Sequence, residues 1–171
     1  NNFVFKVDGN IEQSGSSNIY STSTLTSGPH SVVVEVTSVN GCTTIFDAVL
    51  ILVYDYPVVA PITGPVQVCE GSSVTLSNAT PGGTWSSNNI SVATVNSGGQ
   101  VSGITGGTTV ISYSVVSNGC ETVVNYNFTV NALPAGTITI TENSGVAAND
   151  AIICSGDGIN FTAPPGYSNY Q

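Results

Sequence analysis

Apolar and polar residues alternate along most of this chain in short runs. Clear examples of this alternation are residues 31–37, 74–76, 110–115 and 126–130, which are rich in β-branched and aromatic side chains. A period of two is typical of strands that bury one face, whereas no window keeps the i, i+3, i+4, i+7 spacing of an amphipathic helix. Asn-Gly, Gly-Gly and Pro-Gly turns separate the runs. The pattern predicts an all-β fold built as antiparallel β-sandwiches.

Two sequence signatures each occur twice. An opening signature, Cys69–Leu76, recurs at Cys154–Phe161, and a closing signature, Asn118–Thr122, recurs at Asn40–Thr44. Their order along the chain is closing, opening, closing, opening. The sequence therefore reads as the back half of one unit, a whole unit and the front half of another, as expected for a window on a longer repeat array.

Two proline-containing linkers, residues 56–61 and 131–136, divide the chain. We expect residues 1–57 to be the C-terminal half of an immunoglobulin-like repeat, 58–132 a complete domain, and 133–171 the N-terminal half of a repeat. The two halves together contain 96 residues, the size of one sandwich. Because a half sandwich exposes strand edges and core, the halves are expected to complete each other, within one chain or head to tail.

The charge balance restricts the partners. One basic residue, Lys6, stands against ten carboxylates, which gives a formal net charge of -9. Nucleic-acid binding needs clusters of Lys and Arg and is excluded, and binding to anionic membranes is disfavoured. The longest apolar run, residues 48–53, is far below the roughly 20 residues of a membrane helix, so no membrane insertion is expected. Matched cysteines and the absence of methionine favour an extracellular location.

The central unit carries an ordered series of motifs: Thr84–Ser87, Val92–Val95, Gly99–Ile104 and Gly106–Tyr113. In this series it resembles the group 2 bacterial immunoglobulin-like domains. The resemblance implies tandem immunoglobulin-like sandwiches, one complete and two partial. It also implies that Trp85 is the large core residue of a central strand.

The flanking halves carry a different pattern in residues 3–9, 13–18 and 20–25, together with the closing Asn-Gly-Cys turn. They are similar to repeats of the giant gliding-motility adhesins of Bacteroidota, of the SprB type. This resemblance implies type IX secretion, a place on the bacterial cell surface and contact with polysaccharide or substratum. The predicted function is a structural, adhesive repeat segment of a long secreted adhesin in surface attachment and gliding motility, with neighbouring repeats as partners.

Two alternative functions stay open. The chain could itself be a glycan-binding module, with tyrosines stacking on sugar rings, or an accessory domain of a secreted multidomain enzyme. The candidate stacking residues are Tyr20, Tyr54, Tyr56, Tyr167 and Tyr170. Catalysis by the chain is not expected. Its single histidine, His30, has no nucleophile or carboxylate in a recognisable spacing and is interpreted as a turn residue.

The cysteines predict two disulfides, Cys69–Cys120 in the complete unit and Cys42–Cys154 in the split one, because each pair joins an opening to a closing signature. Four cysteines allow three connectivities. A cysteine before the second strand and one in the last hairpin tend to lie at opposite ends of an immunoglobulin sandwich. Pairing between neighbouring domains is therefore the main alternative. No Cys-x-x-Cys spacing supports a thiolate metal site.

Acidic residues in the last third of the chain are candidate calcium ligands, since interdomain loops rich in oxygen ligands bind this ion. The candidates are Glu142, Asp150 and Asp157. No EF-hand or nonapeptide calcium motif accompanies them, so solvated acidic loops are the favoured interpretation. No other cofactor is expected.

Overall fold

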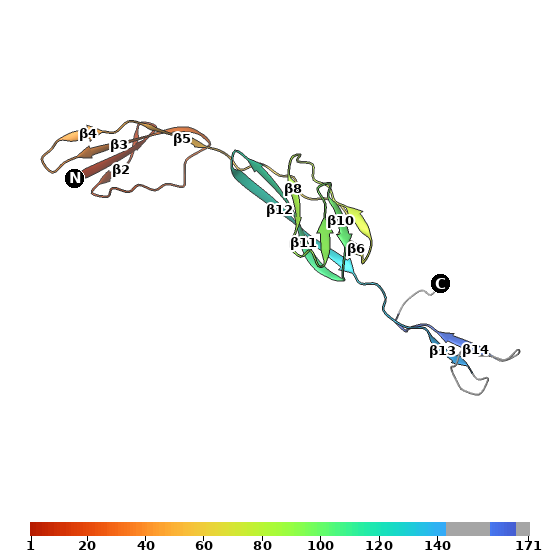
Figure 1. Ribbon diagram of the computed structural model, residues 1–171. Helices are drawn as coiled ribbons and strands as arrows, with labels where there is room; N and C mark the ends of the chain where they lie inside the picture. Colours follow the sequence, from red (N-terminus) through yellow and green to blue (C-terminus); the bar gives the residue numbers. More distant parts are fainter. Residues whose placement is uncertain (143–157, 167–171) are drawn as a thin grey trace.

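The computed structural model describes residues 1–142 and 158–166, and every regular element in these ranges is a β-strand. Three successive units follow one another along an extended chain (Figure 1). The prediction of an all-β protein with tandem immunoglobulin-like sandwiches, one complete and two partial, is confirmed. In the described ranges there is no helix with the length and apolarity that a membrane crossing requires.

The N-terminal unit is a single sheet. Its strands are β1 (Asn2–Val7), β2 (Asn10–Gly15), β3 (Gly28–Thr37), β4 (Thr43–Ile45) and β5 (Val49–Val53). The spatial order is β2-β1-β3-β4, and β5 also pairs with β3. All of these pairs are antiparallel. The sheet is thus held together by its long central strand β3.

The closing segment of this unit differs from the sequence prediction, which placed one strand over residues 46–54. The predicted strand is found as β5, which begins three residues later and ends one residue earlier. Its start is delayed because Ile45 pairs with Glu35 and Val49 pairs with Val32, so three residues lie opposite two. An extra residue on one strand disrupts the ladder in the manner of a β-bulge. The bulge therefore separates β5 from β4, which ends just before the predicted strand, although the Phe46 amide still donates to the Val34 carbonyl at 3.0 Å.

The central unit is a complete two-sheet sandwich. Its strands are β6 (Gln67–Cys69), β7 (Ser73–Thr75), β8 (Thr84–Ser87), β9 (Ala93–Val95), β10 (Gln100–Gly103), β11 (Gly107–Ser117) and β12 (Cys120–Asn131). One sheet has the order β6-β12-β11-β8 and the other β7-β10-β9. Every pair is antiparallel except β6 with β12, which is parallel. The β11–β12 hairpin, paired from Gly107 with Val130 to Ser117 with Cys120, is the longest strand pair of this unit.

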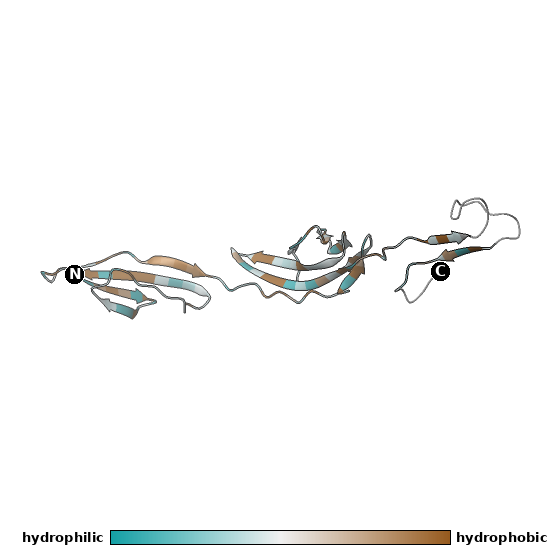
Figure 2. Cartoon of the chain, turned by 90° about the horizontal axis from the view of Figure 1, so that it is seen from below, coloured by the Kyte–Doolittle hydropathy of each residue, from teal (hydrophilic) through white to brown (hydrophobic). Residues whose placement is uncertain are grey.

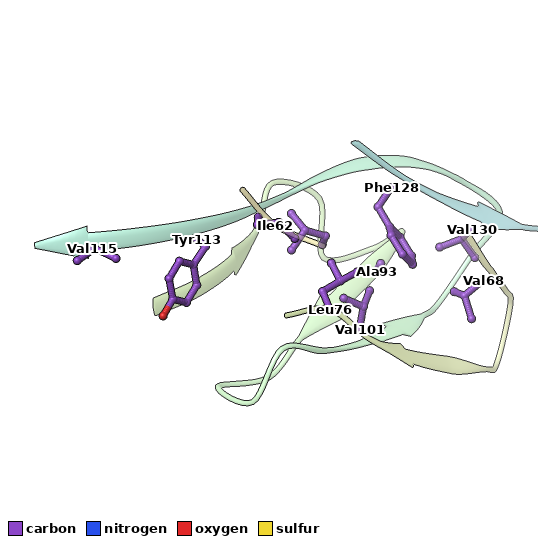
Figure 3. Packing of buried hydrophobic residues seen from close by; sticks show 10 residues of the cluster. Ile62, Val68, Leu76, Ala93, Val101, Tyr113, Val115, Phe128 and Val130 are labelled. Carbon is purple, nitrogen blue, oxygen red and sulfur yellow. The ribbon is translucent and has the colours of Figure 1, made fainter. Parts of the chain in front are cut away.

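Alternating side chains from both sheets form the core between them (Figure 3). Its buried residues are Ile62, Val68, Leu76, Ala93, Val101, Ile111, Tyr113, Val115, Phe128 and Val130. The period of two along β11 and β12 explains why their long strands contribute so many of these side chains. Burial of apolar surface is the main favourable term for such a domain.

Trp85 lies on β8, at the edge of its sheet, so the expected central strand is wrong. Its side chain is half-buried and packs against the core, with its ring 4.8 Å from the ring of Tyr113. Gly99, at a φ of 81°, lies near the Trp85 ring, since a Cβ atom added to it would be 3.2 Å from ring atoms. A Cβ atom there would lie 2.4 Å from the carbonyl oxygen of Leu76, so only glycine fits.

The C-terminal unit is a two-stranded antiparallel pair, β13 (Thr139–Glu142) and β14 (Ile159–Thr162). The sequence predicted strands at 137–140 and 159–162. The second is found where it was expected, and the first begins two residues later. The rest of the predicted front half, at 143–157 and 167–171, lies outside the described residues.

Candidate functional site: an open apolar face and a unit joint

One face of the N-terminal sheet is apolar. Phe3 pairs with Val36 and Phe5 with Val34, so these four side chains share a face with the pair Val7 and Val32 two residues further on. Figure 2 shows hydrophobic segments, in brown, on neighbouring strands of this unit. The alternation in the sequence produces this face directly.

This face lines a hollow of about 390 Å³, which Phe46 and Val49 extend. In the central unit, the sheet β7-β10-β9 covers the corresponding side of the long hairpin. Within the described ranges no second sheet covers the N-terminal one. We call the surface formed by Phe3, Phe5, Val32, Val34, Val36, Phe46 and Val49 the open face.

The strand β5 adds further apolar surface beside it. Val49 and Ile51 lie on the same face as Val32 and are 62% and 40% exposed, whereas Leu50 and Leu52 lie on the opposite face and are 67% and 56% exposed. Contiguous apolar surface of this kind on a soluble protein marks a contact site. The N-terminal unit thus exposes an apolar sheet face that a second apolar surface would stabilise by burying it.

The C-terminal hairpin presents matching apolar side chains. Phe161 is 66% exposed and Ile138 is also 66% exposed. In the repeated opening signature, Phe161 takes the position of Leu76 in the central unit, where Leu76 is 1% exposed inside the core. This hairpin therefore carries core residues that lie uncovered in the described chain.

The N-terminal and central units contact each other at their joint. The closing turn of the central unit, Asn118-Gly119, has positive φ angles of 50° and 84° and leads into Cys120. The Cys120 thiol lies 3.6 Å from the carbonyl oxygen of Tyr54, which follows β5. The tip of the central hairpin thus contacts the last strand of the preceding unit.

The two cysteines of the central unit lie at opposite ends of it. Cys69 pairs with Asn131 at the end of β12, while Cys120 begins the same strand. A strand of this length spans on the order of 35–40 Å, whereas a disulfide requires Cα atoms within about 7 Å. The predicted Cys69–Cys120 disulfide does not form in this structure, because the parallel β6–β12 pairing separates the two thiols.

Cys42 is exposed in the loop between β3 and β4 and has no disulfide partner among the residues that the structure describes. Its predicted partner, Cys154, lies outside the described residues. The Cys42–Cys154 pair therefore stays a prediction, with pairing between units as its alternative.

His30 is buried and held by two acceptors. Its Nδ1 lies 2.7 Å from Asp8 Oδ2, and its Nε2 lies 2.8 Å from the Thr26 carbonyl oxygen. Both ring nitrogens must donate to satisfy a carboxylate and a carbonyl, which only the imidazolium form can do. The Thr26 carbonyl and then Asp8 accordingly raise the pKa of His30.

Asp8 is the matching half of this pair. Its Oδ1 accepts from the Ser31 amide at 2.9 Å, and this bond, followed by that from His30, lowers the pKa of Asp8. The pair pins the β1–β2 turn to the start of β3. Because the Thr26 carbonyl occupies Nε2, the histidine is a structural residue in this arrangement. The turn interpretation is wrong about its place, since His30 lies within β3 and pairs with Ile51.

The remaining predicted residues lie apart from one another. Lys6 on β1 forms an ion pair with Glu35 on β3. Tyr20 stacks on Phe5 with ring centroids 5.8 Å apart, whereas Tyr54 and Tyr56 follow β5 near the joint. Tyr167 and Tyr170 lie outside the described residues, so the glycan-stacking patch stays a prediction.

The calcium prediction has the same status. Glu142 ends β13, and Asp150 and Asp157 lie outside the described residues. Within the described ranges no three His, Cys, Asp or Glu side chains converge in a way that would hold a metal ion. Calcium binding by the acidic loops stays a prediction.

Two features of the site were not found from the sequence. The His30–Asp8 pair joins residues 22 positions apart, and the open face requires the register of β1 on β3. The alternating Phe3, Phe5 and Val7 were visible in the sequence as a signal for the second feature. No local pattern indicated the first.

No protein-family description and no curated protein sequence matches the chain. Among solved structures it is similar to a C-terminal 282-residue fragment of intimin, solved in complex with the intimin-binding domain of the translocated intimin receptor. The identity is 22%, the coverage 83% of this chain and 54% of that one, and the TM-score 0.43. A second similar structure is surface layer protein SbsC, domains 1–6, with 21% identity, coverage of 81% and 21%, and a TM-score of 0.30.

The chain spans about half the length of the intimin fragment and about a fifth of the SbsC structure. Its fold is assigned from its own strand pairing and core.

Proposed function

We propose that this chain is a structural segment of a long bacterial cell-surface adhesin, in which units strung end to end hold an adhesive contact away from the cell. The observation that carries the proposal is the path of the chain through the central unit. The chain arrives at the end where Cys120 meets Tyr54 and leaves at the opposite end, after Asn131. Each unit therefore adds its full length to the array.

The segment that leads into the central unit is held along its side. The Ala60 amide donates to Thr80 Oγ1 at 2.9 Å, and Thr63 exchanges two backbone bonds with Ser77. Further along, the Thr129 amide donates to the Val66 carbonyl at 3.0 Å. These bonds fix the direction in which the chain passes along the sandwich.

This arrangement suits a load-bearing spacer. Tension between the two ends runs parallel to β11 and β12, so it shears a ladder that is registered from Gly107 with Val130 to Ser117 with Cys120. Shearing requires many backbone hydrogen bonds to break together, whereas peeling breaks them one at a time. The short proline-containing linkers limit bending between units.

The resemblance of the flanking halves to gliding-motility adhesin repeats supports the finer proposal. In it, the parent protein is exported by type IX secretion, lies on the cell surface and acts in attachment and gliding. Extracellular polysaccharide or substratum would be the distant partner, and neighbouring repeats of the same chain the immediate ones.

The test is small-angle X-ray scattering on one copy and on two copies of the full chain joined head to tail. The proposal expects the maximum dimension to nearly double in the joined protein, because the units add end to end. A compact particle, with a maximum dimension close to that of one copy, would overturn it.

A second measurement separates the spacer from the glycan-binding alternative. The full chain and its Tyr54→Ser and Tyr56→Ser variants are passed over immobilised alginate and cellulose. A spacer elutes with the void volume in all three cases. Retention of the natural chain that the tyrosine variants lose would assign the adhesive contact to this segment and contradict the spacer role.

A further inference from the structure

The contact between the N-terminal and central units, where Cys120 meets Tyr54, indicates how other successive units of the array meet. Tyr54 lies twelve residues after Cys42, and Ala132 lies twelve residues after Cys120. The two positions are thus equivalent, each just past the last strand of its unit. At the described joint, the closing-turn cysteine of the following unit, Cys120, is 3.6 Å from the Tyr54 carbonyl oxygen.

The C-terminal end of the central unit, where β12 ends at Asn131, also carries the opening cysteine, Cys69. Cys69 pairs with Asn131, the residue before Ala132, and the Glu70 amide donates to the Asn131 carbonyl at 2.8 Å. Neighbouring strands lie about 4.8 Å apart, and disulfide Cα atoms are about 4.4–6.8 Å apart. A closing-turn cysteine that contacts Ala132 as Cys120 contacts Tyr54 would lie at the end of the unit that carries Cys69, beside the residue that follows the Cys69 pairing partner Asn131.

We propose that the cysteines of this array form disulfides across the joints between successive units. Cys69 pairs with the closing-turn cysteine of the following unit, for which Cys42 of a second copy of this chain is the matching residue. Cys120 pairs with the opening cysteine of the unit before it. The proposal rests on the end-to-end array proposed above.

The positions of the thiols agree with this pairing. Cys69 and Cys42 are both exposed, and Cys120 is half-buried at the described joint. Each complete unit presents one thiol at each end, separated by the length of β12, which is too far for a bond within the unit. Cross-joint pairing gives each of them a partner.

The covalent step needs an oxidant, and a small-molecule disulfide such as oxidised glutathione supplies it. Two protein thiols lose two protons and two electrons as their S–S bond forms. The glutathione disulfide is reduced to two thiols and takes up those protons and electrons.

The main experiment joins two copies of the full chain head to tail and equilibrates the product with oxidised and reduced glutathione. Free thiols are then blocked, and the disulfide-linked peptides are identified by mass spectrometry. The expected peptides link Cys69 of the first copy to Cys42 of the second, and Cys154 of the first to Cys120 of the second. Cys69→Ser should remove the first linkage and keep the second, while Cys120→Ser should do the reverse.

Three results would overturn the proposal. They are a Cys69–Cys120 link within one unit, a link between Cys154 of the first copy and Cys42 of the second, and thiols that stay free throughout oxidation. If X-ray scattering shows an extended particle and any of these results is found, the disulfide proposal fails while the spacer function stands. The failure of one proposal is therefore distinguishable from the failure of the other.

A second experiment uses one copy of the chain and does not depend on how the joined copies fold. Tyr54→Cys is introduced together with Cys42→Ser, Cys69→Ser and Cys154→Ser, so that Cys120 is the one native thiol left. Oxidation should form a bond between position 54 and Cys120, with loss of both titratable thiols. The matched control replaces Tyr54→Cys by Val39→Cys, a substitution at an 86% exposed site in the β3–β4 loop, and both thiols should stay free. Failure of the Tyr54→Cys bond to form would overturn the joint geometry and the proposal.

Discussion

At the scale of single residues, the His30–Asp8 pair shows how a polar contact fixes a turn in this chain. Asp8 has a φ of 51°, a conformation that Asp and Asn tolerate better than most residues. Its carboxylate reaches both His30 and the Ser31 amide. The turn, the start of β3 and the loop around Thr26 are thereby joined through one imidazole ring.

This pair predicts a pH dependence. The pKa of His30 is raised above its ordinary value of 6.5, so its stabilising contribution is complete below that value and is lost as the pH rises through the folded-state pKa. The pKa of Asp8 is lowered from 3.8, so its contribution is present above 3.8 and is lost as the pH falls through the folded-state pKa. The pair should stabilise the N-terminal unit most between these two ordinary values.

Proton NMR titration of His30 measures the first part of this prediction. We expect a pKa above 6.5 in the natural chain and a lower pKa in the Asp8→Asn variant, which keeps the turn conformation and loses the negative charge. A His30 pKa at or below 6.5 in the natural chain would contradict the described contacts.

At the scale of elements, the long β11–β12 hairpin determines the central unit. Phe128 on β12 is 1% exposed and lies among core residues of both sheets (Figure 3). Val116 on β11 lies on the opposite, solvent-facing face of the same hairpin and is 63% exposed. The two residues therefore form a matched pair for testing which face holds the unit together.

Phe128→Ala should lower the free energy of unfolding of the central unit by about 3–5 kcal/mol, because it removes a buried ring and leaves a cavity. Val116→Ala should change it by less than about 0.5 kcal/mol. Urea denaturation followed by Trp85 fluorescence measures both. Equal effects of the two substitutions would show that the assigned core face is wrong.

At the scale of the whole molecule, the N-terminal open face and the C-terminal hairpin are complementary. The open face exposes the inner side of a sheet, and the hairpin exposes Phe161, which corresponds to a buried core residue of the central unit. Apolar surfaces of this kind gain free energy when they cover each other. Successive repeats would bury them in every unit of an array.

Two copies joined head to tail should therefore bind less of the hydrophobic dye ANS per chain than one copy does, because the hairpin of the first copy covers the open face of the second. Phe161→Ser in the first copy should restore part of the dye fluorescence by weakening this contact. If joining the copies leaves the fluorescence per chain unchanged, the two surfaces do not cover each other.

The sequence by itself determined the fold class and most strand positions of the described residues. Strand type follows from the period of two, which is a local property, and β14 is found at the residues that the pattern gave. The repeated cysteine signatures also predicted where each unit opens and closes. These features need no knowledge of which strands are neighbours.

Only the tertiary structure decided which residues meet. The parallel pairing of β6 with β12 places Cys69 far from Cys120, and the edge position of β8 leaves Trp85 half-buried. The contact of Cys120 with Tyr54, 66 residues away in sequence, requires two units to be packed at their joint. Strand order, register and joints depend on contacts between distant residues, and a local alternation of apolar and polar side chains is compatible with many of them.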